Sequence, residues 1–330
     1  MNDDASVIRR LAATRPSLFR KGETLMGVPR GLGPDGLDIA AFGIPYDGGA
    51  TGRKGAALGP EQIRHGSYNI SAYNVATRIC PKKLCRVRDI GDTPLDMFDG
   101  SRSYEMITDF CHSVCSTGAR PLAAGGDHSV TLPLLRAVAA RHGPVAVVHF
   151  DAHPDTFDDV FGHRYNHATP FRRAIEERLE DPKRHVMIGL RGTTIYPAEH
   201  FDWAEAQGIT MLGAEACFEM GARKIAELCR ETVGNRPVYV TIDVDGLDPA
   251  DMPGTGSPEP GGLRMRDVQV ILRGLRGLNV VGADVVEVFP LLDPTGYTAT
   301  NAAHLMFELL CVMAESVSGR SPPESKGARA

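Results

Sequence analysis

The stretch "PVAVVHFDAHPDTFDD" (144–159) leads from an apolar segment directly into a cluster of aspartates and histidines. A nearly continuous apolar run is typical of a strand that is covered on both faces of a parallel sheet. Aspartate is almost never fully buried unless it is paired or bound to a metal. Asp151, His153 and Asp155 therefore indicate a site at the end of a strand, where something compensates the negative charge.

Similar apolar runs recur along the chain and predict the fold class. Segments with one apolar helical face, such as 104–118 and 132–143, separate most of these runs. Strands that alternate with helices form the crossover units of a parallel sheet, so we expect an α/β fold. The expected strands lie within residues 37–45, 85–92, 120–127, 144–151, 185–191, 209–215, 236–245 and 280–288.

The composition excludes several classes of protein. The chain has 330 residues, a formal net charge of −5 and no long run of Lys and Arg, so we expect no nucleic-acid partner. No apolar stretch approaches the roughly 18 residues of a membrane-spanning helix. The seven cysteines form no CxxC pair, which predicts reduced thiols and a cytoplasmic protein.

Three polar motifs follow expected strands, and the carboxyl ends of parallel strands share one edge of a sheet. The motifs are "GGDHS" (125–129), "DAHPD" (151–155) and "DVD" (243–245). In an extended segment, side chains two residues apart point the same way, so "DAHPD" would align Asp151, His153 and Asp155, and "DVD" would align Asp243 and Asp245. The six candidate metal ligands are His128, Asp151, His153, Asp155, Asp243 and Asp245.

The charge of this set predicts its metal content. Four aspartates carry four negative charges, which two divalent ions would cancel. A carboxylate-rich set without thiolates suits Mn²⁺ better than structural zinc. Two ions about 3.5–4 Å apart also generate a nucleophile from water at neutral pH. One such motif alone would equally suit a helix cap or a surface turn. A two-metal phosphoesterase is a second alternative, but it would need an Asn-His pair that "GGDHS" lacks.

Taken together, the motifs resemble the ureohydrolase family of arginases, agmatinases and guanidino-acid hydrolases. Besides the three above, the matching stretches are "GIPYDGGATGRKGAALGPEQIR" (43–64), "DIGD" (89–92) and the extension to "DVDGLDPADMPGTGSPEPGG" (243–262). The resemblance implies a three-layer α/β/α domain with a mostly parallel eight-stranded sheet, a binuclear manganese site and a homo-oligomer, trimer or hexamer. We place that single domain at 17–317, between a flexible segment (1–16) and a disordered tail (318–330).

The resemblance also implies roles for individual residues. His128, Asp151, Asp155 and Asp243 would hold one ion, and Asp151, His153, Asp243 and Asp245 the other. "ADVVEVFP" (283–290) matches the segment whose glutamate binds the guanidinium group, here Glu287, and "NHATPFRRA" (166–174) matches the segment whose histidine shuttles protons, here His167. Asp155 would pass a proton to the leaving amine. The products would be urea and an amine.

The position two residues after Asp155 distinguishes substrates, because arginases have a small polar residue there and this chain has Phe157. Arginine is therefore disfavoured, and agmatine and guanidino acids stay open. Phe157, Tyr165 and Asn166 are the expected contacts of the substrate tail. Pro154 and Ala168 depart from the usual motif, which leaves open a small or alkylated guanidine and the use of Ni²⁺.

Two other readings have weaker support. A metal-bearing, non-catalytic partner subunit of an active homologue would be expected to lose a ligand, His167 or Glu287, and none is lost. A deacetylase-like zinc enzyme would keep fewer ligands at one metal, whereas His153 and Asp245 are both present.

Overall fold

The computed structural model describes residues 23–96, 98–194 and 198–319, which contain one eight-stranded sheet. Its strand order is β2-β1-β3-β8-β7-β4-β5-β6, and every neighbouring pair is parallel. All eight predicted strands are present, although β5 begins five residues before its predicted segment 185–191. They are β1 Ile39–Gly43, β2 Val87–Asp92, β3 Arg120–Ala124, β4 Val145–Phe150, β5 Glu180–Leu190, β6 Thr210–Gly213, β7 Val238–Asp243 and β8 Val280–Val286.

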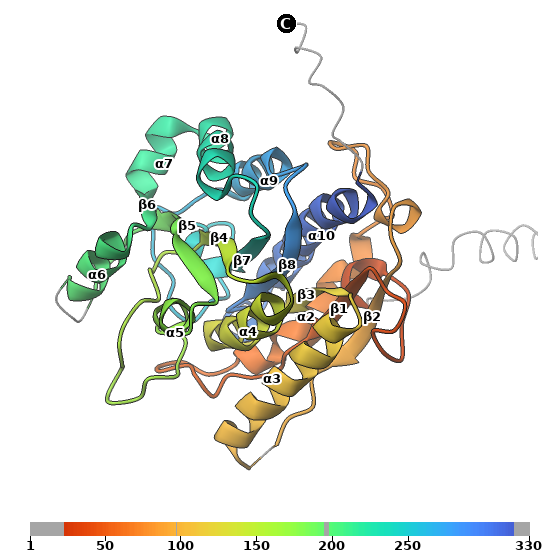
Figure 1. The fold of residues 1–330 in the computed structure, drawn as a ribbon, viewed down its shortest axis with the longest axis horizontal. Helices are drawn as coiled ribbons and strands as arrows, with labels where there is room; N and C mark the ends of the chain where they lie inside the picture. Colours follow the sequence, from red (N-terminus) through yellow and green to blue (C-terminus); the bar gives the residue numbers. More distant parts are fainter. Residues whose placement is uncertain (1–22, 97, 195–197, 320–330) are drawn as a thin grey trace, which may run out of the picture.

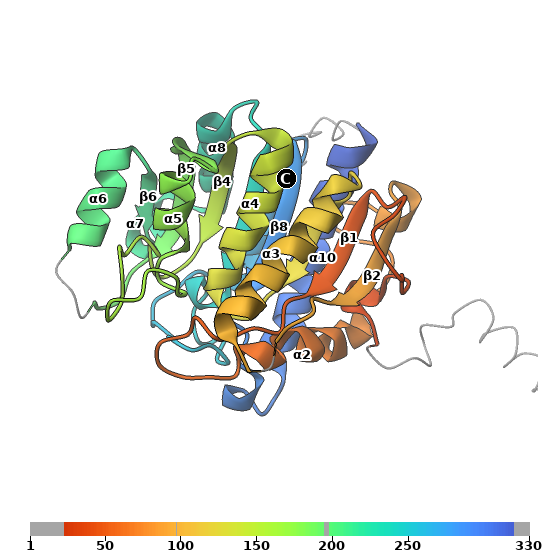
Figure 2. The same cartoon turned by 60° about the horizontal axis from the view of Figure 1, so that its bottom comes forward.

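Helices cover both faces of the sheet, so the predicted three-layer α/β/α architecture is confirmed (Figures 1 and 2). The α-helices are α2 Gly59–Gly66, α3 Gly100–Ser116, α4 Thr131–His142, α5 Pro170–Glu176, α6 Glu199–Gln207, α7 Ala214–Met220, α8 Ala222–Val233, α9 Met265–Gly274 and α10 Tyr297–Ser318. Short 3₁₀ turns are η2 Leu25–Gly27, η3 Ala56–Leu58, η4 Ser67–Asn69, η5 Pro81–Lys83, η6 His128–Val130, η7 Val244–Gly246 and η8 Pro290–Leu292.

Side-chain alternation along the strands divides the core into two layers. On β4, Ala146, Val148 and Phe150 pack toward helices α8, α9 and α10. Val145 and Val147 belong to the other layer, with α3 and α4. A strand that is buried on both faces has apolar residues at most of its positions, which explains the nearly continuous apolar runs in the sequence.

Helix α3 shows how local sequence sets a boundary. It begins four residues earlier than the 104–118 segment predicts, because Asp99 caps it by accepting the amides of Ser101 and Arg102. Cys111 and Cys115 are buried on its inner face, as expected for packing residues. All seven cysteines are free thiols.

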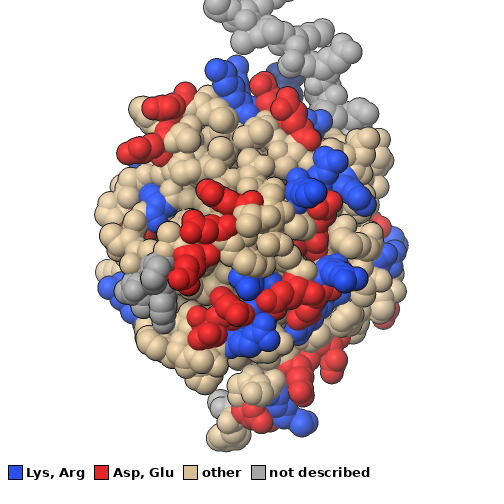
Figure 3. All heavy atoms as spheres, turned by 60° about the vertical axis from the view of Figure 1, so that its left-hand side comes forward, with Lys and Arg blue, Asp and Glu red and all other residues tan. Residues whose placement is uncertain are grey.

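The ends of the predicted domain are only partly described. The predicted flexible segment 1–16 lies outside the described residues, as do residues 320–330 of the predicted tail. Helix α10 continues to Ser318, so the first residue of that predicted tail is helical. None of the described helices has the length and hydropathy needed to cross a membrane. On the face shown in Figure 3, acidic and basic side chains are interspersed.

Candidate metal centre

The candidate site lies at the carboxyl ends of four neighbouring strands, β3, β8, β7 and β4. Because these strands are parallel, the segments that follow them meet at one edge of the sheet. The segments carry His128 after β3, Glu287 after β8, the Asp243–Asp245 pair at β7, and residues 151–155 after β4. The sheet order therefore brings together motifs that are more than 150 residues apart in the sequence.

Tight turns, not extended strands, bring the ligand candidates together, and here the sequence argument from side-chain alternation is wrong. Asp151 accepts the backbone amide of His153 (2.6 Å), which folds the chain back at the end of β4. Asp243 accepts the amide of Asp245 (2.8 Å) in the same way and caps η7. Aspartate favours such turns because its short side chain can bond the backbone two residues ahead.

Two glycines allow these turns to pack closely. A Cβ atom on Gly246 would lie 2.7 Å from the backbone nitrogen of Asp151, so η7 could not approach the end of β4. A Cβ atom on Gly126 would lie 1.7 Å from the carbonyl oxygen of Tyr46. The loop after β3 therefore needs glycine where it passes the loop after β1.

His128 is fully buried, and its Nδ1 atom faces three carboxylates. Nδ1 lies 3.1 Å from Asp151, 2.9 Å from Asp155 and 3.3 Å from Asp243. Despite these distances it makes no hydrogen bond. Ligands about 2.1 Å from an octahedral ion lie about 3 Å from one another. A buried, unbonded nitrogen with this spacing to three carboxylates fits a metal ion at the centre of the group.

His153 marks a second group of ligand atoms. Its Nδ1 lies 3.1 Å from Asp245 and 3.4 Å from Asp151. The ligand atoms of these three residues all lie within 4.8 Å of one another. Asp151 offers Oδ1 to His153 and Oδ2 to His128, so one carboxylate faces both groups. This is the arrangement that a carboxylate shared between two ions would have.

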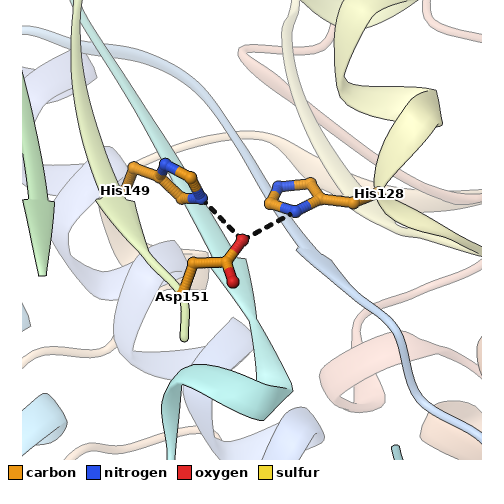
Figure 4. Close-up of side chains that lie close together, drawn as sticks. All are labelled: His128, His149 and Asp151. Atoms are coloured by element: carbon orange, nitrogen blue, oxygen red, sulfur yellow. Dashed lines mark hydrogen bonds and ion pairs between the residues drawn. The ribbon is translucent and has the colours of Figure 1, made fainter. Parts of the chain in front are cut away.

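His149 also lies beside Asp151, as Figure 4 shows, but its geometry differs from that of His128. Its Nε2 makes a 2.8 Å hydrogen bond with Oδ2 of Asp151. Burial lowers the pKa of His149 to about 3. A neutral imidazole that is hydrogen-bonded to a ligand orients that ligand. We therefore interpret His149 as a support of Asp151 and His128 as the ligand.

The site concentrates negative charge in a buried place. Burial, with Asp245 and Asp151 nearby, raises the pKa of Asp243 well above its usual value. Burial and Asp151 raise the pKa of Asp155 to about 6. In the described part of the chain, no Lys or Arg side chain forms an ion pair with any of the four aspartates. Divalent cations would supply the missing positive charge, and oxygen and imidazole ligands without thiolates suit Mn²⁺.

His167 is held between Glu287 and Thr51. Its Nδ1 lies 3.3 Å from Oε1 of Glu287, and its Nε2 lies 2.9 Å from the Thr51 hydroxyl. Burial lowers the pKa of His167, but the Glu287 carboxylate outweighs this effect and raises it to about 9. The pair combines a proton-exchanging group with a carboxylate that can bind a cation.

Two of the predicted catalytic residues have unusual backbone conformations. Asp155 has φ 50° and Glu287 has φ 63°, in the left-handed region that residues other than glycine rarely adopt. Such conformations cost about 1–3 kcal/mol and cluster at functional sites, where the surrounding structure maintains them. Both residues are also buried. These observations favour a functional role for both positions.

The three predicted tail contacts are placed differently. Phe157 stacks on His200, with ring centroids 3.9 Å apart. Tyr165 is 56% exposed and lies 6.2 Å from the ring of Tyr104. The Asn166 amide bonds the carbonyl of residue 163 and the amide of residue 168 within its own loop. For Asn166, this favours a role in shaping the loop over direct contact with a substrate.

The sequence argument did not assign several polar residues that support the site. Thr241 and Asp284 lie inside β7 and β8, fully buried, and Thr241 contacts His128. His149 lies inside β4, and Thr51 is in the loop after β1. The sequence did contain a signal for Thr241, Asp284 and His149, because a polar residue inside a fully buried apolar strand requires a specific partner.

Comparison with known proteins identifies the family. A model of the Arginase family matches residues 37–312. Guanidinopropionase of Pseudomonas aeruginosa is 46% identical over 296 residues, which cover 89% of this chain and 92% of that protein. Guanidinobutyrase of the same organism is 43% identical over 293 residues, covering 88% and 92%. The structure of proclavaminate amidino hydrolase from Streptomyces clavuligerus has a TM-score of 0.87 and 41% identity, covering 91% of this chain and 99% of that one.

The fold is an all-parallel eight-stranded sheet with clustered aspartates and histidines at its carboxyl edge. The family model and the relatives match most of the chain. The chain belongs to the arginase family. Within it, the chain is a ureohydrolase of the agmatinase and guanidino-acid hydrolase type, and the family expected from the sequence motifs is confirmed.

Proposed function

We propose that this ureohydrolase cleaves a guanidino compound without an α-amino acid end to urea and an amine, with a short guanidino acid as the first candidate and agmatine as the next. The guanidinopropionase and guanidinobutyrase similarities support a guanidino acid. The observation that carries the chemistry is the unbonded, buried Nδ1 of His128 facing three carboxylates.

The six ligand candidates would hold two divalent ions, with Mn²⁺ preferred and Ni²⁺ as the alternative. His128, Asp151, Asp155 and Asp243 would hold one, and Asp151, His153, Asp243 and Asp245 would hold the other. When bound, the ions supply a nucleophile at neutral pH by lowering the pKa of water. Their four positive charges cancel the four aspartates and leave the charge of Glu287 to act on the substrate.

Glu287 recognises the guanidinium group. Its side chain is buried at the end of β8, and Oε1 is fixed by a 2.8 Å hydrogen bond from the backbone amide of His128. A carboxylate in this position attracts a cation and orients it through charge-assisted hydrogen bonds. The guanidinium carbon is thereby held beside the candidate ligands, since His128 itself positions the carboxylate.

Asp155 and His167 transfer protons during the reaction. Attack of water on the guanidinium carbon gives a tetrahedral centre, and its C–N bond breaks only when the departing nitrogen gains a proton. Asp155 takes the proton that the attacking water releases and passes it to the departing amine, and His167 exchanges protons with the solvent. The exposure of His167 suits this exchange, because 20% of its side chain is accessible.

Urea release from a panel of guanidino compounds tests the proposal. The panel is 3-guanidinopropanoate, 4-guanidinobutanoate, agmatine, L-arginine and methylguanidine, each with Mn²⁺, Ni²⁺ or a chelator. We expect urea and the matching amine in equal amounts, with the highest kcat/KM for a guanidino acid or agmatine and none with the chelator. No urea from any compound with either metal would overturn the proposal.

The same panel separates the two other candidates. Pro154 and Ala168 depart from the usual motif, so a preference for methylguanidine with Ni²⁺ would favour hydrolysis of a small or alkylated guanidine. A protein that binds two ions but releases no urea would favour a non-catalytic partner subunit. A homo-oligomer and a cytoplasmic location stay predictions, which size-exclusion chromatography with light scattering and cell fractionation would test.

A further inference from the structure

A chain of hydrogen bonds lies behind His128, on the side away from the carboxylates. Nε2 of His128 lies 3.0 Å from the hydroxyl of Thr241, and that hydroxyl lies 2.5 Å from Oδ1 of Asp284. Thr241 and Asp284 are register partners on the adjacent strands β7 and β8. All three side chains are fully buried, so water does not compete for these contacts.

The donor and the acceptor of each of these hydrogen bonds can be assigned. A threonine hydroxyl has one hydrogen, and an ionised carboxylate only accepts. The short contact with Asp284 therefore uses the hydrogen of Thr241, and the hydroxyl oxygen must accept a hydrogen from Nε2 of His128. In a neutral imidazole only one nitrogen carries a hydrogen. Its placement on Nε2 leaves the lone pair of Nδ1 directed at the three carboxylates.

Asp284 has further partners besides Thr241. It also accepts hydrogen bonds from the hydroxyls of Tyr239 (2.6 Å) and Thr131 (2.8 Å), so three hydroxyl groups converge on one carboxylate. Among the described residues, no Lys or Arg pairs with it. A carboxylate placed behind a ligating histidine fixes the orientation of the ring and increases its basicity.

We propose that Thr241 and Asp284 are positioning residues that fix the tautomer and orientation of His128 and thereby set the affinity of one of the two ions. The inference rests on the ligand roles in the proposed function. It adds that these two residues affect the affinity of only one of the two ions. Loss of the Thr241 hydroxyl should weaken the ion held by His128 and leave the ion held by His153 largely unchanged. Loss of such supporting groups typically costs about 10–100-fold in metal affinity.

The test measures Mn²⁺ binding to the full chain by equilibrium dialysis with metal analysis. We expect two ions per wild-type chain. Thr241→Val should lose about 10–100-fold in affinity at one site only, Asp284→Asn should weaken the same site, and Thr241→Ser should restore the wild-type value. Tyr239→Phe and Thr131→Val are matched controls, because each removes one hydrogen bond from Asp284 but keeps the link to His128. Urea unfolding of the metal-free proteins checks that each variant folds.

The outcomes separate this inference from the proposed function. No Mn²⁺ binding by the wild type would overturn the proposed function, and the inference with it. Two ions bound by Thr241→Val with wild-type affinities would overturn only the inference. Equal losses in Thr241→Val and the two control variants would also overturn it, since they would show a general effect on the core. If Thr241→Val does not fold, Asp284→Asn and Thr241→Ser decide the question in the same assay.

Discussion

Nδ1 of His167 lies 3.3 Å from Oε1 of Glu287, although the two residues are 120 positions apart in the sequence. The same oxygen accepts the backbone amide of His128 at 2.8 Å. One carboxylate oxygen therefore links the loop that carries the proton-exchange candidate to the loop that carries a metal-ligand candidate. A guanidinium group that binds Glu287 would lie within reach of both.

His167→Ala should lower kcat without removing metal. The contribution of a general acid or base is typically about 10²–10⁴-fold. His167 contacts Glu287 and Thr51 but none of the six ligand candidates within ion-pair distance. We therefore expect a loss of kcat in that range and an unchanged metal content, measured by urea release and metal analysis on the same sample. An unchanged kcat across pH would remove His167 from the mechanism.

The His167–Glu287 pair should also make the stability of the metal-free protein depend on pH. The pKa of His167 is raised from 6.5 to about 9, so its protonated form stabilises the fold. That contribution is fully present below about pH 6.5 and is lost as the pH rises through about 9. A shift of this size corresponds to about 3 kcal/mol. Urea unfolding of the wild type and His167→Gln should differ at pH 6 and converge above pH 9.

Glu287→Gln supplies the control for this pH effect. The amide keeps the shape of the side chain but removes the charge that raises the pKa of His167. In the Glu287→Gln background, the His167→Gln substitution should have a much smaller pH-dependent effect on the free energy of unfolding. If the effect keeps its full size, the pairing of these two residues is not its cause.

Asp243→Ala should remove metal and activity together. Asp243 faces His128 at 3.3 Å and anchors the turn that carries Asp245, so its loss affects both groups of ligands. We expect fewer than one tightly bound ion per chain and no detectable urea release. Asp109→Ala, on the exposed side of α3, should retain two ions and full activity. Normal turnover of Asp243→Ala with metal bound would contradict the ligand assignment.

The fold was predictable from the sequence because parallel strands that are buried on both faces are mostly apolar. Each of the eight apolar runs therefore overlaps one of the eight strands, although β5 begins five residues before its run. The candidate site was predictable because its motifs follow strand ends, which a parallel sheet places at one edge. The turns within residues 151–155 were not predicted, because the assumption of extended backbone ignored the Asp151 side chain, which accepts the amide of His153.

The supporting residues were harder to predict because their partners depend on strand register. Thr241 and Asp284 are 43 residues apart, and only the pairing of β7 with β8 places them side by side. The stacking partner of Phe157 was also not predictable from the sequence, because His200 lies on a separate element, α6. Composition and spacing identify that a buried polar residue needs a partner, but they do not identify the partner.

L-Arginine should be a much poorer substrate than a guanidino compound without an α-amino acid end. Of the three expected tail contacts, Phe157 and Tyr165 are aromatic rings, and the Asn166 amide is engaged in its own loop. An α-carboxylate and α-ammonium left without partners would cost several kcal/mol, or about a thousandfold in kcat/KM. The measurement compares kcat/KM for L-arginine, agmatine, 4-guanidinobutanoate and 3-guanidinopropanoate. A preference for L-arginine would show that the argument from Phe157 is wrong.

The Glu287→Gln variant tests whether different residues bind the guanidinium group and the tail of the substrate. Glu287 should contact the guanidinium group that all these substrates share, so its substitution should lower every kcat/KM by a similar factor. Phe157→Ala, in contrast, should change the ratios between substrates, because the tails differ where the ring lies. Both variants should retain two ions, since neither residue is a ligand candidate. If Glu287→Gln reorders the substrates instead of lowering them all, Glu287 contacts the tail and this division of the site fails.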